Sequence, residues 1–131
     1  MILGAECNIW RRWTQIYQAN RHISDYLYNN NKNKIAIYGM SELGVTLFKD
    51  LDKTDIQIVC CIDKKKRLDN MGIKTIIPSD LAMYHDEIDL IIVTPVQYWK
   101  EINKELKKYI SSKTCVIGLD ELLIRIVLEK Y

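Results

Sequence analysis

Large apolar residues near the start of the chain recur every three or four positions. Over residues 9–29 this spacing is typical of one face of a helix, with polar side chains on the rest of its circumference. The apolar positions are Trp10, Trp13, Ile16, Tyr17, Ile23, Tyr26 and Leu27. Asn8 can cap the start, and the asparagine-rich residues 29–33 are typical of a turn. The pattern predicts one amphipathic helix, which with its linker occupies residues 1–33.

From residue 34 onward, short apolar runs alternate with amphipathic stretches. The predicted strands are residues 34–38, 56–62, 74–77, 89–94 and 114–118. The predicted helices are residues 42–49, 79–84 with Ser79 as N-cap, 97–110 and 121–129. Continuous apolar strands separated by helices indicate a parallel sheet with right-handed crossovers. We therefore predict an α/β fold over residues 34–131. It is a Rossmann-like three-layer sandwich with a five-stranded parallel sheet ordered 3-2-1-4-5, and the N-terminal helix is added to one face.

Composition excludes several classes of protein. The 131 residues, 48% hydrophobic and 27% charged, suit one globular domain and leave no room for a separate substrate domain. The net charge is +2, and no basic block is long enough to follow a nucleic-acid backbone. The apolar runs are too short for a membrane span, and the first residues lack the pattern of a signal peptide. We expect a cytoplasmic protein that binds neither nucleic acid nor membrane.

Cysteine and histidine give no sign of a metal centre. The four cysteines are Cys7, Cys60, Cys61 and Cys115. Cys60 and Cys61 are adjacent in a predicted strand, so their side chains should point to opposite faces. With Cys115 they are expected to be unreactive thiols of the core. The two histidines, His22 and His85, are too few and too far apart for a metal site or a nucleophile and base, so we predict no metal and no catalytic residues.

A glycine-containing turn follows the first predicted strand and opens a helix. Residues 39–44 have the position and the outer spacing of the dinucleotide fingerprint GxGxxG, with Ser41 in place of the middle glycine. A serine there obstructs the approach of a pyrophosphate slightly, but its hydroxyl can donate to a phosphate oxygen. The alternative is purely structural, since Gly39 can make the turn and Gly44 can permit contact between helix and sheet. The predicted phosphate-binding residues are Gly39, Met40, Ser41, Glu42, Leu43 and Gly44.

Three further positions lie at predicted strand ends. Asp63 follows the second strand, 24 residues after Gly39, close to the offset of the acidic residue that holds ribose hydroxyls. A helix cap or a solvated loop is its alternative role. Lys64 begins the basic run 64–67, which suits either a phosphate, including the 2′-phosphate of NADP, or a solvated turn. Thr94 ends the fourth strand, where it either lines a ligand site or simply precedes Pro95.

Four segments also carry a family resemblance, namely residues 34–44, 59–64, 76–81 and 89–95. They resemble the small Rossmann-type domains of bacterial surface-polysaccharide proteins. Two such domains are the one preceding the catalytic part of membrane-bound nucleotide-sugar epimerases/dehydratases and the N-terminal domain of sialic-acid-type sugar acyltransferases. The resemblance covers about residues 34–123 and implies a nucleotide, nucleotide-sugar or NAD(P) site over Gly39, Ser41, Glu42, Leu43 and Asp63. The sequence departs from these proteins in lacking their membrane helices, their β-helix repeats and the middle glycine.

Three functions compete at this stage. The first is a stand-alone domain that binds a nucleotide, a nucleotide sugar or NAD(P), accessory to polysaccharide metabolism and not an enzyme by itself. The second is a protein-interaction module in which the first helix docks a partner or a second copy. For the protein in general we predict a homodimer, because the two tryptophans of this helix and their aromatic neighbours exceed what the edge of a small sheet covers. A minimal oxidoreductase is the third, and it needs a substrate pocket and a positioned acid or base that the sequence does not show.

Overall fold

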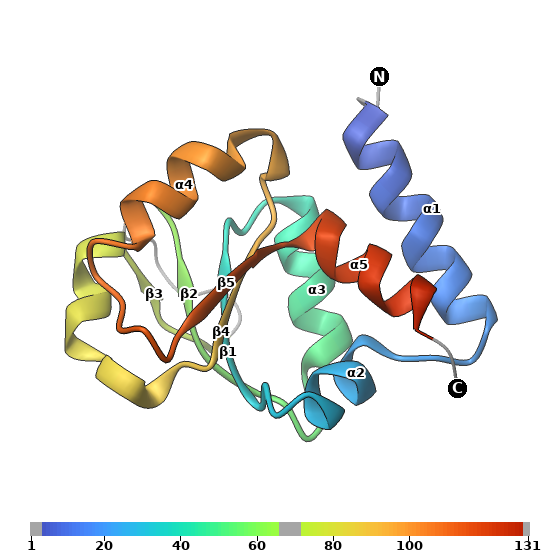
Figure 1. Ribbon diagram of the computed structural model, residues 1–131, viewed down its shortest axis with the longest axis horizontal. Coiled ribbons are helices and arrows are strands. Elements are labelled where there is room, and N and C mark those ends of the chain that lie inside the picture. Colours follow the sequence, from blue (N-terminus) through green and yellow to red (C-terminus); the bar gives the residue numbers. More distant parts are fainter. Residues whose placement is uncertain (1–3, 66–71, 130–131) are drawn as a thin grey trace.

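Five parallel strands form one sheet at the centre of the computed structural model, which describes residues 4–65 and 72–129 (Figure 1). The strands are β1 (Lys34–Tyr38), β2 (Gln57–Ile62), β3 (Thr75–Ile76), β4 (Leu90–Val93) and β5 (Cys115–Gly118). Their order is β3-β2-β1-β4-β5, and every neighbouring pair is parallel. The predicted fold class and strand order are confirmed.

Helices cover both faces of the sheet (Figure 1). One face carries α1 (Gly4–Gln18), α2 (Ile23–Asn29), α3 (Glu42–Leu51) and α5 (Leu119–Leu128). The other carries α4 (Trp99–Leu106), which follows the short η3 (Val96–Tyr98), and the 3-10 segments η1 (Pro78–Met83) and η2 (His85–Glu87). Because side chains alternate along a strand, neighbours such as Cys60 and Cys61 enter different core layers, as predicted, and both are fully buried.

The prediction of one long N-terminal helix is wrong. The chain breaks between α1 and α2, where Asn20 has a φ of 56° and the amide of Arg21 donates to the carbonyl of Ile16. Asparagine tolerates this left-handed conformation, which reverses the chain without any glycine or proline to mark it. Asn8 lies inside α1 and accepts a hydrogen bond from Arg11, so it is not the N-cap. The apolar spacing continues across the break and therefore concealed it.

The apolar stripe of α1 packs within the chain. Ile9 and Ile16 are buried where α1 packs on α5, in the core cluster that α5 shares with one face of the sheet. Trp10 and Trp13 stack on each other, with ring centroids 5.7 Å apart, and lie partly buried on the same core. The surface on which the predicted homodimer depended is therefore largely covered by the protein itself.

Three smaller predictions also need correction. The helix expected over residues 79–84 is a 3-10 segment that starts at Pro78, because proline suits the first position of a helix and the Asp80 carboxylate accepts from the amide of Ile77. Ser79 is therefore not its cap. The helix expected over residues 97–110 is shorter, since α4 ends at Leu106. Cys115 is exposed rather than buried, because it begins the edge strand β5.

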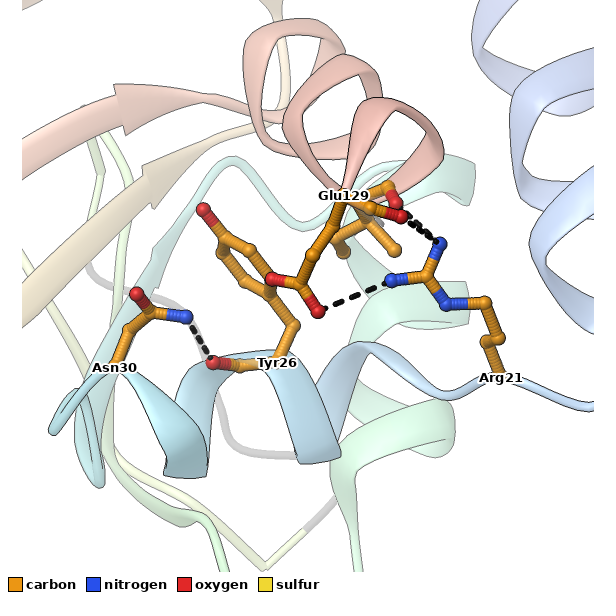
Figure 2. A network of polar contacts seen from close by, with 5 residues as sticks. Arg21, Tyr26, Asn30 and Glu129 are labelled. Atoms are coloured by element: carbon orange, nitrogen blue, oxygen red, sulfur yellow. Dashed lines mark hydrogen bonds and ion pairs between the residues drawn. The ribbon is translucent and has the colours of Figure 1, made fainter. Parts of the chain in front are cut away.

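A polar network holds the end of α5 to the segment between α1 and α2 (Figure 2). The Arg21 guanidinium donates to the carbonyl oxygen of Ile126 at 2.5 Å and to Oε1 of Glu129 at 3.1 Å. Beside it the side-chain amide of Asn30 donates to the carbonyl of Tyr26 at 2.7 Å and closes the end of α2. These contacts give the Ile126 and Tyr26 carbonyls a side-chain donor in addition to the backbone amides of Glu129 and Asn30.

Candidate functional site

The carboxyl ends of β1, β2 and β4 meet around a cavity of about 270 Å³. It is lined by Tyr38, Gly39, Met40, Ser41, Asp63, Lys64, Pro95, Tyr98 and Ile102. Five of the predicted site residues are thus brought together, although they come from two loops more than twenty residues apart. In open α/β sheets ligands bind outside the carboxyl ends of the strands, where the strand order reverses. Here that point lies between β1 and β4.

Gly39 makes the turn that borders this cavity. Its φ is 88°, and a Cβ at this position would lie 2.7 Å from both Pro95 Cδ and Thr94 Oγ1. Its amide donates to the carbonyl of Ile62 at 2.9 Å, which ties the end of β1 to the end of β2. The turn is therefore fixed between two strand ends, and only glycine fits it.

Gly44 lets α3 begin directly against this turn. A Cβ on Gly44 would lie 1.9 Å from the carbonyl oxygen of Gly39, closer than any real contact. Leu43 is buried in the core, so only its backbone amide can face a ligand, whereas the side chain of Glu42 is exposed. Gly39 makes the turn and Gly44 permits close packing of α3, which are the structural roles given as the alternative to phosphate binding. A phosphate site of the fingerprint type needs the same close packing of helix and turn.

The start of α3 offers unpaired amides to an anion. Ser41 is the N-cap residue, its side chain makes no capping hydrogen bond, and the first intrahelical bond runs from the Val45 amide to the Ser41 carbonyl. The amides of residues 42–44 precede that bond and have no intrahelical acceptor. With the positive end of the helix dipole, they favour a phosphate group at the cavity.

Asp63 and Lys64 stand at the end of β2. The amide of Asp63 donates to the carbonyl of Ile76 at 2.9 Å, and Oδ1 of Asp63 accepts from the amide of Lys64 at 2.7 Å. The carboxylate is thereby oriented at the cavity that Asp63 lines. Lys64 and Lys65 are exposed, while residues 66 and 67 of the basic run lie outside the described residues.

The predicted site residues Glu42, Leu43 and Gly44 are not among the residues that line the cavity, and neither is Thr94. Its side chain is 1% exposed, and its hydroxyl shares one proton between the carbonyl oxygens of Tyr38 and Gly39, each 2.9 Å away. Its amide also donates to Tyr38 at 3.0 Å. Thr94 therefore holds the turn in place from behind, on the side away from the cavity lining.

Several lining residues were missed by the sequence analysis. A second cavity of about 250 Å³ continues from the first and is lined by Tyr38, Lys64, Tyr98, Glu101, Ile102 and Glu105. Residues 98, 101, 102 and 105 have the spacing of one helix face, which was a usable signal. Tyr38 is the last residue of β1 and only 4% exposed. Burial raises the pKa of its phenol, and the charges of Glu105 and Asp63 raise that pKa further, so the hydroxyl remains protonated at neutral pH.

Among residues 4–65 and 72–129, no group of three His, Cys, Asp or Glu side chains could hold a metal ion. Within the same residues, no helix combines the length and the apolar character that crossing a bilayer requires.

Comparisons with known proteins agree with the geometry. A family model described as C2185-like, N-terminal, matches residues 31–117, a span that contains the residues lining both cavities. Among solved structures, C. glutamicum DAP dehydrogenase in complex with DAP is similar, with a TM-score of 0.52 and 17% identity. The match covers 66% of this chain and 27% of that one, so the chain corresponds to about a quarter of the dehydrogenase, and the likeness shows a Rossmann-like fold. No curated protein matches the sequence.

Proposed function

The chain belongs to the C2185-like N-terminal family, and we propose that its domain binds a nucleotide-type ligand at the carboxyl ends of β1 and β2. One observation carries this proposal. The Gly39 turn, Ser41 at the N-cap of α3 and Asp63 at the end of β2 line a single cavity, although more than twenty residues separate the turn from Asp63 in the sequence. A dinucleotide or a nucleotide sugar carries both the phosphates and the ribose that such groups bind.

Each part of such a ligand has a partner in the cavity. The phosphates face the amides of residues 42–44 and the Ser41 hydroxyl, where the helix dipole favours an anion. The ribose hydroxyls donate to Asp63, whose carboxylate the Lys64 amide holds in place. Lys64 supplies a positive charge close to both groups.

The proposed role is binding rather than catalysis. NAD(P) and nucleotide sugars are the candidate ligands, and no metal takes part in the proposed binding. The structurally similar protein is a dehydrogenase, but this chain matches 27% of it, and a dehydrogenase must also bind and position a second substrate. A role in surface-polysaccharide metabolism and a cytoplasmic location stay predictions from the sequence.

Thermal unfolding with added ligands tests the proposal. NAD, NADP, UDP-glucose and CoA are each added at millimolar concentration. A ligand at about a hundred times its dissociation constant stabilises the folded state by about 2.7 kcal/mol, which raises the melting temperature of a domain this size by roughly 5–10 °C. No shift with any nucleotide would refute the proposal and favour the interaction module.

Asp63→Ala then assigns the binding to this site. Loss of the ribose contact should weaken affinity by about 1.5–3 kcal/mol, the usual contribution of a hydrogen bond to a charged group. Asp55→Ala is the matched control, because Asp55 is exposed and precedes the amino end of β2, at the other end of the strand from Asp63. Equal affinity in both variants would place the ligand elsewhere.

A further inference from the structure

The cavity at the glycine turn extends along α4 into the second cavity. The two share Tyr38, Lys64, Tyr98 and Ile102, and the second adds the carboxylates of Glu101 and Glu105. In a nucleotide the ribose stands between the phosphates and the base. A ligand with its phosphates at Ser41 and its ribose at Asp63 therefore extends its base into the second cavity. The reverse orientation would set phosphates against two carboxylates, which like charge opposes.

Tyr98 supplies a surface on which a base can stack. Its side chain lines both cavities and is 58% exposed, so the ring is accessible to a ligand at their junction. Ile102, from the next turn of α4, is nearly buried and forms an apolar wall beside it. Aromatic rings stack on any base, so these two residues favour a base without selecting one.

The polar groups of the second cavity are selective. Glu101 and Glu105 lie one turn apart on α4, and neither carboxylate has a hydrogen-bond or ion-pair partner among the described residues. Tyr38 is 4% exposed and lines both cavities, and within the described part of the chain its hydroxyl has no partner either. A carboxylate can only accept hydrogen bonds. Beside the Lys64 ammonium at the junction with the first cavity, the second cavity thus offers two carboxylate acceptors and the Tyr38 hydroxyl, and a base that faces the two carboxylates must supply donors.

Bases differ in what they supply. Adenine, guanine and cytosine each carry an exocyclic amino group with two N–H donors, whereas uracil, like thymine, has a carbonyl oxygen in its place. A carbonyl facing a carboxylate brings two acceptors together and leaves both unpaired, and such unpaired polar groups reduce binding.

We infer that this site selects nucleotides whose base carries an exocyclic amino group and discriminates against uracil. The inference rests on the proposed function and adds its base specificity. Glu101 and Glu105 are its selective residues, Tyr98 is the stacking platform, and Tyr38 is a hydroxyl partner for the ring edge of the base.

Calorimetric titration of the full chain with ADP, GDP, CDP and UDP tests the inference. The four probes share phosphates and ribose and differ only in the base. We expect UDP to bind at least tenfold more weakly than the tightest of the other three. UDP binding as tight as the best of them would overturn the inference while leaving the proposed function standing.

The variant Glu101→Gln/Glu105→Gln removes both charges with little change of shape and adds amide donors. The tightest amino-bearing nucleotide should lose about tenfold or more in affinity, while UDP should bind unchanged or better. Glu87→Gln is the matched control, since Glu87 is exposed on η2 and lines neither cavity. An unchanged ratio between UDP and the other nucleotides in the double variant would overturn the inference.

Failure of the proposed function gives a different result. If none of the four probes binds to the wild-type chain, the nucleotide site itself is refuted, and base selection with it. If they bind but Asp63→Ala leaves their affinities unchanged, the ligand lies elsewhere, and the second cavity does not receive its base. Melting temperatures without ligand, measured for every variant, separate loss of binding from loss of folding.

Discussion

At the scale of single residues, Gly44 shows how closely the site and the fold depend on each other. Gly44→Ala would bring a Cβ within 1.9 Å of the Gly39 carbonyl oxygen, and backbone cannot give way as a side-chain end can. We expect the free energy of unfolding to fall by at least about 2 kcal/mol, because the clash outweighs the higher helix propensity of alanine. Urea unfolding measures this change.

Gly118→Ala is the control for that substitution. Its Cβ would lie 2.6 Å from Oδ1 of Asp120, the end of a side chain that can rotate away. We expect a loss below about 1 kcal/mol. Equal losses at the two positions would contradict the close packing of α3 on the turn.

The buried thiol of Cys60 makes the free energy of unfolding depend on pH in the alkaline range. Burial, with Cys61 beside it, raises the pKa of the Cys60 thiol to about 12 from its ordinary value of 9.0, although Lys74 acts in the opposite direction. The unfolded chain therefore releases this proton near pH 9, while the folded chain holds it until about pH 12, so stability is lost as pH rises through that window. Between pH 8 and pH 10.5 this group alone should lower the free energy of unfolding by about 2 kcal/mol.

Cys60→Ala removes that contribution, so its stability should fall less steeply over the same pH range than the wild type. Cys7→Ala, which removes an exposed thiol, should leave the wild-type slope unchanged. Identical slopes for wild type and Cys60→Ala in urea unfolding would show that Cys60 does not titrate differently on folding.

At the scale of elements, the strands were predictable and the helix ends were not. Uninterrupted apolar runs such as β4 identify buried strands without knowledge of their neighbours, and the crossover rule then limits their order. The break between α1 and α2 depends on one asparagine with positive φ, and many sequences without a break contain the same residue. Local apolar periodicity carries no information about such a turn.

The candidate site divides in the same way. The turn at Gly39 and the acid at Asp63 follow directly from strand ends, so the sequence indicates both. Tyr38 and the face of α4 reach the cavity only because β4 lies beside β1 and its helix crosses the opposite face. The proximity of Tyr38 to α4 depends on both the strand order and the alternation of side chains along β1. A search for sequence motifs does not combine these two features.

The contact between Arg21 and the end of α5 is testable at this scale. Arg21 is 10% exposed and bonds both a helix-end carbonyl and Glu129, so Arg21→Gln leaves acceptors at the end of α5 without their partner. We expect a loss of about 1–3 kcal/mol in urea unfolding. Arg125→Gln is the matched control, because its 3.1 Å ion pair with Glu121 is more than half exposed and should contribute under about 1 kcal/mol. Equal losses of unfolding free energy in Arg21→Gln and Arg125→Gln would contradict a stabilising role for the Arg21 contacts.

At the scale of the whole molecule, α1 and α2 share one core with the sheet. Ile9, Ile23 and Leu27 are fully buried in the same layer as β1 and α3. The described residues before 34 therefore contribute to the core of the domain. They are more than an added helix and a linker. The apolar residues that first suggested a partner are among those that this packing uses.

The packing of α1 within the chain bears on the oligomeric state of the protein. Trp10 and Trp13 predict a homodimer from the sequence, but both lie partly buried against the core beside α5. A stable dimer needs on the order of 800 Å² of surface from each partner, rich in apolar side chains at its centre. Outside the apolar stripe that packs on α5, Tyr17 is the large hydrophobic residue exposed on the described part of α1, with 73% of its surface accessible. We expect a monomer by sedimentation at tens of micromolar, whereas a dimer that Tyr17→Ser dissociates would restore association through the outer face of α1.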